Sequence, residues 1–287
     1  MKAIYKKEVK SYLTSMIGYV FIFFILLLEG IYFTAYNLQN AYPLFGTTLS
    51  AVTFIFLILV PVLTMKTIAE ERKQKTDQLL LTAPVSVSEI VLGKFLALAT
   101  VYAIPVLIIC LYPMIMGKYG TVSYAMAYTA VLGFALLGFA QIAVGVFWSS
   151  VTENPVIAAV VTFIVLFVCY MITGIGSLIP DSSMASLACY MLLVLLAAVW
   201  IYHMIRNLWI AAVIGIAGEA ALAITYVVKS TLFEGSIQKF LSVFDITSHF
   251  DNFTNGILDL QGVVYFLSVI IIFLVLTVQT ITKRRWN

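Results

Sequence analysis

The sequence predicts an all-α, polytopic membrane protein with about eight transmembrane helices, and composition is the first reason. Of the 287 residues, 63% are hydrophobic and 10% are charged, whereas soluble domains have roughly 45–50% and about 25%. A soluble fold of this size cannot cover so much apolar surface with polar groups. Composition therefore excludes a cytosolic enzyme, a nucleic-acid-binding protein and a secreted disulfide scaffold, so we expect a lipid bilayer and no nucleic acid as partner.

Long apolar runs are the second reason, because a spanning helix needs about 20 mostly apolar residues. Continuous runs favour helices, since a membrane barrel would show short alternating segments. The first run exceeds the 7–15 residues of a cleaved signal core, so we expect it to be retained as a span. The predicted spans are 15–36, 48–66, 91–116, 124–149, 156–179, 184–202, 208–228 and 262–282.

The distribution of Lys and Arg is the third reason, because inner loops of membrane proteins are enriched in these residues. With both termini in the cytoplasm, thirteen of the sixteen Lys and Arg residues lie inside. The inner set is Lys2, Lys6, Lys7, Lys10, Lys66, Arg72, Lys73, Lys75, Lys94, Arg206, Lys283, Arg284 and Arg285, and the outer set is Lys118, Lys229 and Lys239. This asymmetry predicts an even number of spans in the cell membrane.

The spans 184–202 and 208–228 form a pair that crosses together or not at all, because the C-terminal charges must stay inside. Each run is long enough to span, which favours two crossings. A pair of re-entrant or interfacial helices is the alternative.

Three regions of the single transmembrane domain expected over residues 1–287 are not spans. Residues 1–14 combine lysines with apolar residues at helical spacing, which predicts an amphipathic helix in the membrane interface. Residues 67–90 form the longest inner loop. Residues 229–261 mix aromatic and acidic residues, which indicates one or two short amphipathic helices at the outer interface.

The inner loop 67–90 is the most informative stretch. It begins with Glu70, Glu71, Arg72 and Lys73, which are mostly good helix formers. Three leucines follow, including Leu80, and then Thr82-Ala83-Pro84, where the proline cannot continue a helix. Ser86 and Glu89 have the spacing of a capping box that starts the next helix. The loop is either an ordinary charged connection or a docking helix for a soluble partner.

Two stretches of the chain resemble a known family. Residues 70–94 carry Glu-Glu-Arg-x3-Thr-x-Gln-Leu-Leu-Leu-Thr-Ala-Pro-Val-Ser, running on to Glu-Ile-Val-Leu-Gly-Lys, and are similar to the connection between the second and third spans of ABC-2-type transporter permeases. Residues 250–268 resemble the segment before the last span in the gliding-motility and nitrous-oxide-reductase-maturation permeases. That family usually has six spans, so the pair within 184–228 would be an addition.

The resemblance implies that residues 68–82 form a coupling helix in a groove of a separate ATPase. The implied coupling residues are Glu70, Glu71, Arg72, Lys73, Leu80, Thr82 and Pro84. It also implies that helix 1–14 lies beside this segment, and that the short outer helices help close the pathway. ATP binding would draw two ATPase copies together and move the spans. Two ATPases need two membrane halves, so we expect a homodimer or a heterodimer with a related permease.

The chain cannot hydrolyse ATP, because it has no G-x-x-x-x-G-K-[ST] loop. Gly93-Lys94 and Gly117-Lys118 lack the upstream glycine and the following Ser or Thr. We therefore expect no enzyme activity, catalytic residue, metal or cofactor on this chain, and ATP-Mg on the partner ATPase. The output is either export of a substrate or work on an extracytoplasmic partner protein.

Two acids, Glu29 and Glu219, fall inside predicted spans, where ionisable groups are costly and are functional candidates. Glu219 is near mid-span and could face a substrate or move protons, or it could be a protonated packing group. Glu29 lies in the outer half of its span, which favours a structural role. Gln141 is flanked by small residues and indicates helix–helix packing.

Two other classes of protein compete with a permease powered by a partner ATPase. A secondary transporter driven by an ion gradient would need several embedded ionisable residues in repeated halves, and the sequence has two such acids and no repeat. A membrane-embedded enzyme would need a cluster of catalytic residues, but His203 and His249 are isolated.

Overall fold

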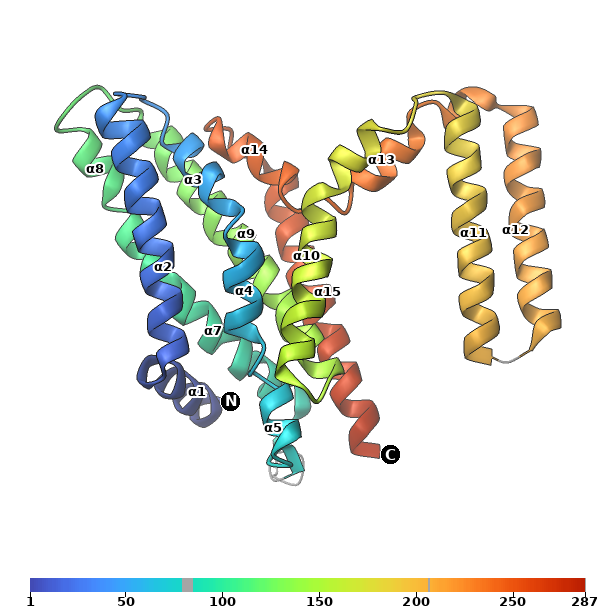
Figure 1. The fold of residues 1–287 in the computed structure, drawn as a ribbon, viewed down its shortest axis with the longest axis horizontal. Helices are drawn as coiled ribbons and strands as arrows, with labels where there is room; N and C mark the ends of the chain where they lie inside the picture. The colour runs from blue at the N-terminus through green and yellow to red at the C-terminus, as the bar shows by residue number, and fades with distance from the viewer. Residues whose placement is uncertain (79–84, 206, 287) are drawn as a thin grey trace. The chain divides into compact units, whose positions relative to one another are not determined.

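The computed structural model describes residues 1–78, 85–205 and 207–286, and all regular structure in them is helical (Figure 1). By contacts the chain divides into unit 1, residues 1–168 and 246–287, and unit 2, residues 169–245. In chain order, the helices up to the boundary are α1 (Lys2–Thr14), α2 (Met16–Tyr32), the π-helix η1 (Phe33–Gln39), α3 (Phe45–Thr53), α4 (Phe56–Thr64), α5 (Ala69–Lys73), α7 (Val87–Ile109), α8 (Tyr112–Met116), α9 (Tyr124–Val151) and α10 (Pro155–Ser177). The unit boundary falls within α10.

Unit 2 continues with a helical hairpin and two short helices. Its elements are α11 (Ser183–Ile205), α12 (Leu208–Val228), the 3-10 helix η2 (Ser230–Phe233) and α13 (Ser236–Ser242). The chain then returns to unit 1 with α14 (Ser248–Thr254) and the last helix, α15 (Leu260–Trp286). The expected short helices within 229–261 are therefore η2, α13 and α14, and they belong to different units.

The all-helical, polytopic prediction is confirmed, with five to seven candidate spans among the described residues against about eight predicted from the sequence. Among the described residues, five helices are long and apolar enough to cross a membrane. The count reaches seven if each of two bent helix pairs is one span. The first pair is Phe45–Thr53 with Phe56–Lys73, bent by 58°, and the second is Ala212–Val228 with Ser230–Ser242, bent by 116°. The described apolar part of α11, Ser183–Val199, is shorter than a span. The two helices expected within 184–228 thus exist, but their length alone does not establish two crossings.

The helix α9 is the centre of unit 1, and α15, α4, α7, α3 and α14 pack on it. Small residues allow this close packing. A Cβ atom added to Gly138 would lie 2.3 Å from the ring of Tyr102 on α7. A Cβ added to Gly145 would lie 2.3 Å from the hydroxyl of Thr64 on α4. Both glycines are therefore needed where neighbouring helices touch α9.

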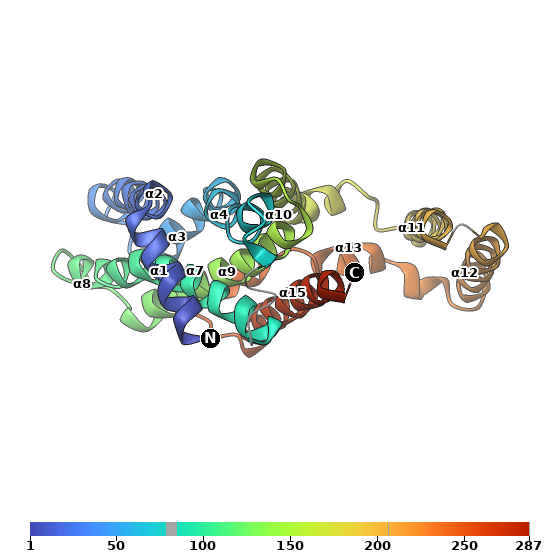
Figure 2. The same ribbon diagram turned by 90° about the horizontal axis from the view of Figure 1, so that it is seen from below.

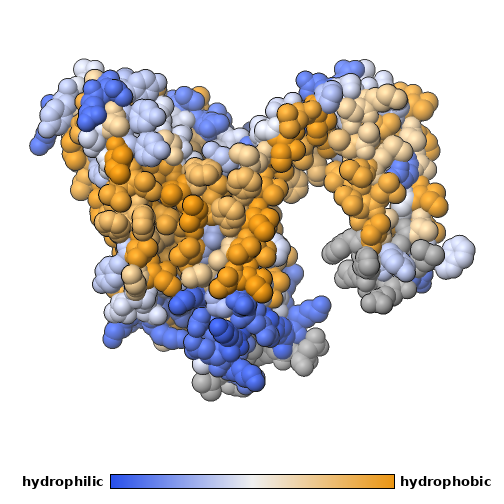
Figure 3. All heavy atoms as spheres, viewed as in Figure 1, coloured by the Kyte–Doolittle hydropathy of each residue, from blue (hydrophilic) through white to orange (hydrophobic). Residues whose placement is uncertain are grey.

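Unit 1 has two polar ends separated by an apolar belt on the face shown in Figure 3. We call the end that carries α1, α5 and the C-terminal turn of α15 the basic end (Figure 1, bottom). The opposite end carries α8, α14 and the start of α3, and we call it the distal end. The apolar belt between polar ends is what a bilayer-spanning bundle requires.

Candidate functional site

The short helix α5 begins where the chain leaves α4 at the basic end, and the end of α9 holds its first turn. The residue before α5, Ile68, has no side-chain oxygen that could cap the helix. Instead the hydroxyl of Ser149 accepts hydrogen bonds from the backbone N–H groups of Ile68 and Ala69, both at 3.1 Å. The same hydroxyl donates to the carbonyl of Met65 at 3.2 Å. One serine on α9 thus fixes the direction in which α5 starts.

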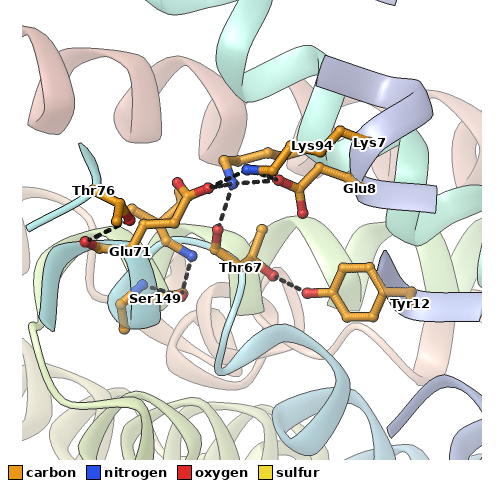
Figure 4. A network of polar contacts seen from close by, with 10 residues as sticks. Lys7, Glu8, Tyr12, Thr67, Glu71, Thr76, Lys94 and Ser149 are labelled. Carbon is orange, nitrogen blue, oxygen red and sulfur yellow. Dashed lines mark hydrogen bonds and ion pairs between the residues drawn. The ribbon is translucent and has the colours of Figure 1, made fainter. Parts of the chain in front are cut away.

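A buried lysine connects α5 to two other helices (Figure 4). The side chain of Lys94 on α7 is only 1% exposed. Its Nζ lies 3.0 Å from a carboxylate oxygen of Glu8 on α1 and 2.9 Å from one of Glu71 on α5. It also donates to the carbonyl of Thr67 at 2.8 Å. All three donors of the ammonium group are used, which is what a buried charge requires.

A second lysine balances the charge of this cluster. The Nζ of Lys7 lies 3.3 Å from Glu71 and 3.6 Å from Glu8, so two ammonium groups meet two carboxylates. Burial lowers the pKa of Lys7, but Glu71 and Glu8 outweigh it, and the net effect is a raised pKa. Beside them the hydroxyl groups of Tyr12 and Thr67 are 3.0 Å apart. Burial raises the pKa of Tyr12 far above its usual range, so it stays neutral.

The opposite side of α5 is tied to α9 and α15 through Arg72. Its guanidinium donates to the backbone carbonyl of Ser150 and lies 3.3 Å from the carboxylate of Glu153. Arg284 on α15 shares Glu153 at 2.9 Å and lies 3.8 Å from Asp77. Burial and the neighbouring Arg284 lower the pKa of Arg72 below its ordinary value. Through Glu71 and Arg72, α5 is thus joined to α1, α7, α9 and α15.

The structure divides the residues predicted for docking into two groups. Glu71 and Arg72 are part of the internal network just described. Lys73 is exposed, and half-buried Glu70 accepts a hydrogen bond from the amide of Gln74 at 2.7 Å. The exposed surface continues over residues 74–76, where Lys75 has a φ of 57° and so turns the chain after α5. Leu80, Thr82 and Pro84 lie outside the described residues.

Sequence reasoning missed the partners of α5. Lys94 was counted only as an inner basic residue, yet it follows two turns of mostly apolar helix. A lysine at such a position needs a carboxylate partner, and Glu8 is the one acid among the first ten residues. That signal could have paired Lys94 with Glu8. Nothing in the sequence indicates that Ser149 caps a helix eighty residues away.

The intramembrane polar residues lie in three separate places. Glu29 on α2 is 0% exposed, and neither of its carboxylate oxygens has a hydrogen-bond partner among the described residues. Gln141 is buried in α9, between the two glycines that contact α7 and α4. Glu219 is half-buried and lines an apolar groove between α11 and α12 in unit 2.

The Ser86–Glu89 spacing predicted a helix start, and the structure confirms it. The hydroxyl of Ser86 accepts a hydrogen bond from the backbone N–H of Glu89 at 3.3 Å, at the first turn of α7. This cap restarts the helix after the inner loop. Lys94 lies two turns further on.

A family model matches the chain. The family model described as the ABC-2 family transporter protein matches residues 2–284, nearly the whole chain. A search of curated proteins found no match.

Proposed function

The chain belongs to the ABC-2 family of transporter membrane proteins, and from this premise we propose that α5 and the exposed residues after it receive the ATPase. Members of the family are multi-pass permease subunits without an ATPase domain, and they work with ABC ATPases. The chain is therefore the membrane component of an ABC transporter. Under the proposal, ATP-driven movement of the partner reaches the membrane helices through the network around Lys94.

The observation that carries the proposal is that α5 is anchored to the bundle and leads directly into an exposed polar segment. One side, with Glu71 and Arg72, is anchored to α1, α7, α9 and α15. The last residue of α5, Lys73, and residues 74–76 directly after the helix are polar and exposed. A segment of this kind can bind a soluble protein and still transmit its displacement, because buried ion pairs resist separation.

The proposed orientation places the basic end and both termini in the cytoplasm. Thirteen of the sixteen Lys and Arg residues then lie inside, as inner loops require. The distal end then faces outward, where α14 covers α9 and α3. Its Phe253 packs so closely on Gly133 that an added Cβ would lie 2.5 Å away. We infer that α14 helps to close the pathway on the outer side.

The proposed assembly has two permeases and two ATPases, with ATP-Mg on the ATPases. Symmetry favours two membrane halves, either two copies of this chain or this chain with a related permease. The resemblance of residues 250–268 supports the gliding-motility and nitrous-oxide-reductase-maturation subgroup. In that case the output is export or mechanical work on an extracytoplasmic protein.

Copurification of the ATPase with the full-length permease tests the proposal. We expect the double variant Lys73→Glu/Lys75→Glu to retain much less ATPase than the wild type, because it reverses two exposed charges next to α5. The control Lys229→Glu/Lys239→Glu makes the same charge change at two exposed positions outside the basic end. Equal ATPase recovery with both variants would refute docking at this segment.

A further inference from the structure

The N-terminal helix α1 carries a row of lysines that the coupling network does not use. Lys2, Lys6 and Lys10 are spaced four residues apart and all three are exposed. At about 100° per residue, this spacing places them along one flank of the helix. The row is a strongly basic strip on the surface of the basic end, where α1 lies against α7 (Figure 2).

The other flank of α1 is fixed by specific contacts, so the row has a defined direction. The hydroxyl of Tyr5 lies 2.9 Å from that of Thr100 on α7. Glu8 pairs with Lys94, and Tyr12 with Thr67. Because these contacts hold one side of α1 against the bundle, the lysine row must face away from it.

No carboxylate in the described part of the chain forms an ion pair with the lysines of the row. Within residues 1–14, the groups that form ion pairs with described residues are the N-terminal amine, Lys7 and Glu8. Glu8 is the one acid of the helix, and Lys94 and Lys7 already occupy it. Three exposed positive charges in a row therefore lack a counter-ion among the residues that the structure describes.

The surroundings of the row indicate what supplies the counter-ions. Half-buried Val9 and Leu13 lie beside the lysines, within the same arc of about 100°. After an extended Ser15, the membrane helix α2 begins with Met16, which is 80% exposed. The row thus ends one helical turn before the last residue of α1, close to the start of the membrane helix α2, with apolar side chains beside it. Lysines in such a place lay their stems along acyl chains and direct their ammonium groups to phosphates.

We propose that Lys2, Lys6 and Lys10 form a binding strip for anionic phospholipid headgroups of the adjacent leaflet. Charge complementarity and a position close to the start of α2 both favour this occupant over an acidic protein surface. Each lysine near an anionic membrane surface strengthens binding about fivefold. The strip holds α1 on the bilayer independently of the ATPase, so its test is separate from that of coupling.

Lipid retention by the purified full-length chain tests the proposal. The chain is extracted from vesicles of phosphatidylcholine and phosphatidylglycerol, and the ratio of the two retained lipids is measured by mass spectrometry. The test variant is Lys2→Gln/Lys6→Gln/Lys10→Gln. The control Lys118→Gln/Lys229→Gln/Lys239→Gln removes the same charge from three exposed lysines outside α1. A third variant replaces the row with arginines.

The wild type, the control and the arginine variant are expected to retain phosphatidylglycerol in excess. The glutamine variant is expected to lose roughly tenfold or more of this excess, and high salt to reduce it in the wild type. An unchanged excess in the glutamine variant would overturn the proposal. An equal loss in the control would also overturn it, because net charge alone would then set retention.

If the glutamine variant fails to fold, single substitutions are expected to give about fivefold losses each. Full retention in well-folded single variants would contradict the proposal. Loss of ATPase copurification with unchanged lipid retention would assign the row to the ATPase instead.

Discussion

At the scale of single residues, Lys94 shows how a charge is kept at the border of an apolar bundle. Its ammonium group is almost completely buried and meets Glu8, Glu71 and the Thr67 carbonyl within 3.0 Å. Removing one partner of such a cluster leaves uncompensated buried charge, which costs more than the pair contributes. Lys94 is therefore a positioning residue for α1 and α5.

We expect Lys94→Met to lower the stability of the purified permease by about 3 kcal/mol, because Glu8 and Glu71 would lose their common partner. Thermal unfolding in detergent measures this effect. The exposed Lys73→Met is the control and should leave the melting temperature unchanged. Equal melting temperatures for the two variants would show that the cluster contributes nothing to stability.

The raised pKa of Lys7 sets the pH range of its contribution to stability. A raised pKa in the folded state means that the contribution is complete at neutral pH. It is lost only when the pH rises through the folded-state pKa, on the alkaline side of the ordinary lysine value. The ion cluster at the basic end is therefore expected to be intact throughout the physiological range.

Glu29 is the opposite case, a buried carboxyl group with no partner among the described residues. We expect Glu29→Gln to change stability by less than about 1 kcal/mol, because a neutral amide of the same shape loses no ion pair. Glu29→Lys should lose several kcal/mol, because it buries a cation without a counter-ion. Melting temperatures of both variants, with transport assays at equal expression, measure this. Loss of transport in a stable Glu29→Gln variant would contradict a structural role.

At the scale of elements, α5 is too short to be stable by itself. A helix of five residues forms few backbone hydrogen bonds, and isolated helices under about 12 residues are marginal. Its position depends on the cap from Ser149 and on the ion pairs of Glu71 and Arg72. The sequence predicts a charged helix here, whereas its fixed direction comes entirely from distant helices.

We expect Ser149→Ala to destabilise the start of α5 by about 1–3 kcal/mol, because two buried N–H groups lose their acceptor. Hydrogen–deuterium exchange of the peptide covering residues 66–73 should then become faster. Ser150→Ala is the matched control, because its hydroxyl donates only to Phe147 within α9. Equal exchange in the two variants would show that the Ser149 cap is dispensable.

The elements differ in how far the sequence predicts them, and the reason is physical. The long helices follow from apolar length, and the cap at Ser86 follows from a local spacing. The ion cluster joins residues up to 86 positions apart, and no local pattern encodes such contacts. The sequence predicts a coupling helix at residues 68–82, and the contacts of Glu71 and Arg72 with the bundle add what local spacing cannot show.

At the scale of the whole molecule, the chain combines two units with different interiors. Unit 1 has a central helix, α9, with close glycine contacts. In unit 2, α11 and α12 pack mainly on each other and on η2. The ends of the hairpin are close, since the N–H of Gly235 donates to the carbonyl of Asp181 at 3.2 Å. The five long apolar helices and the bent pair that begins with α3 all lie in unit 1 or in α10, whereas α11 and α12 belong to unit 2.

We therefore expect unit 1 to tolerate replacement of residues 183–233 by a Gly/Ser linker of about six residues, which is a common loop length. Removing two crossings leaves α15 in its original orientation. Membrane accumulation and the melting temperature measure the outcome. Deletion of α11 alone is the control, because it would place the C-terminal charges on the wrong side. If both deletion variants accumulate equally, α11 and α12 do not cross the membrane as a pair.

The claim that the ATPase engages the chain next to α5 is tested most directly by site-specific photo-crosslinking in the assembled complex. A photoreactive residue is placed at exposed Gln74, and in a second variant at Tyr119, beyond α8 at the distal end. We predict a covalent adduct with the ATPase from position 74 and none from position 119. An intact complex that yields no adduct at position 74, or yields one at position 119, would contradict the claim.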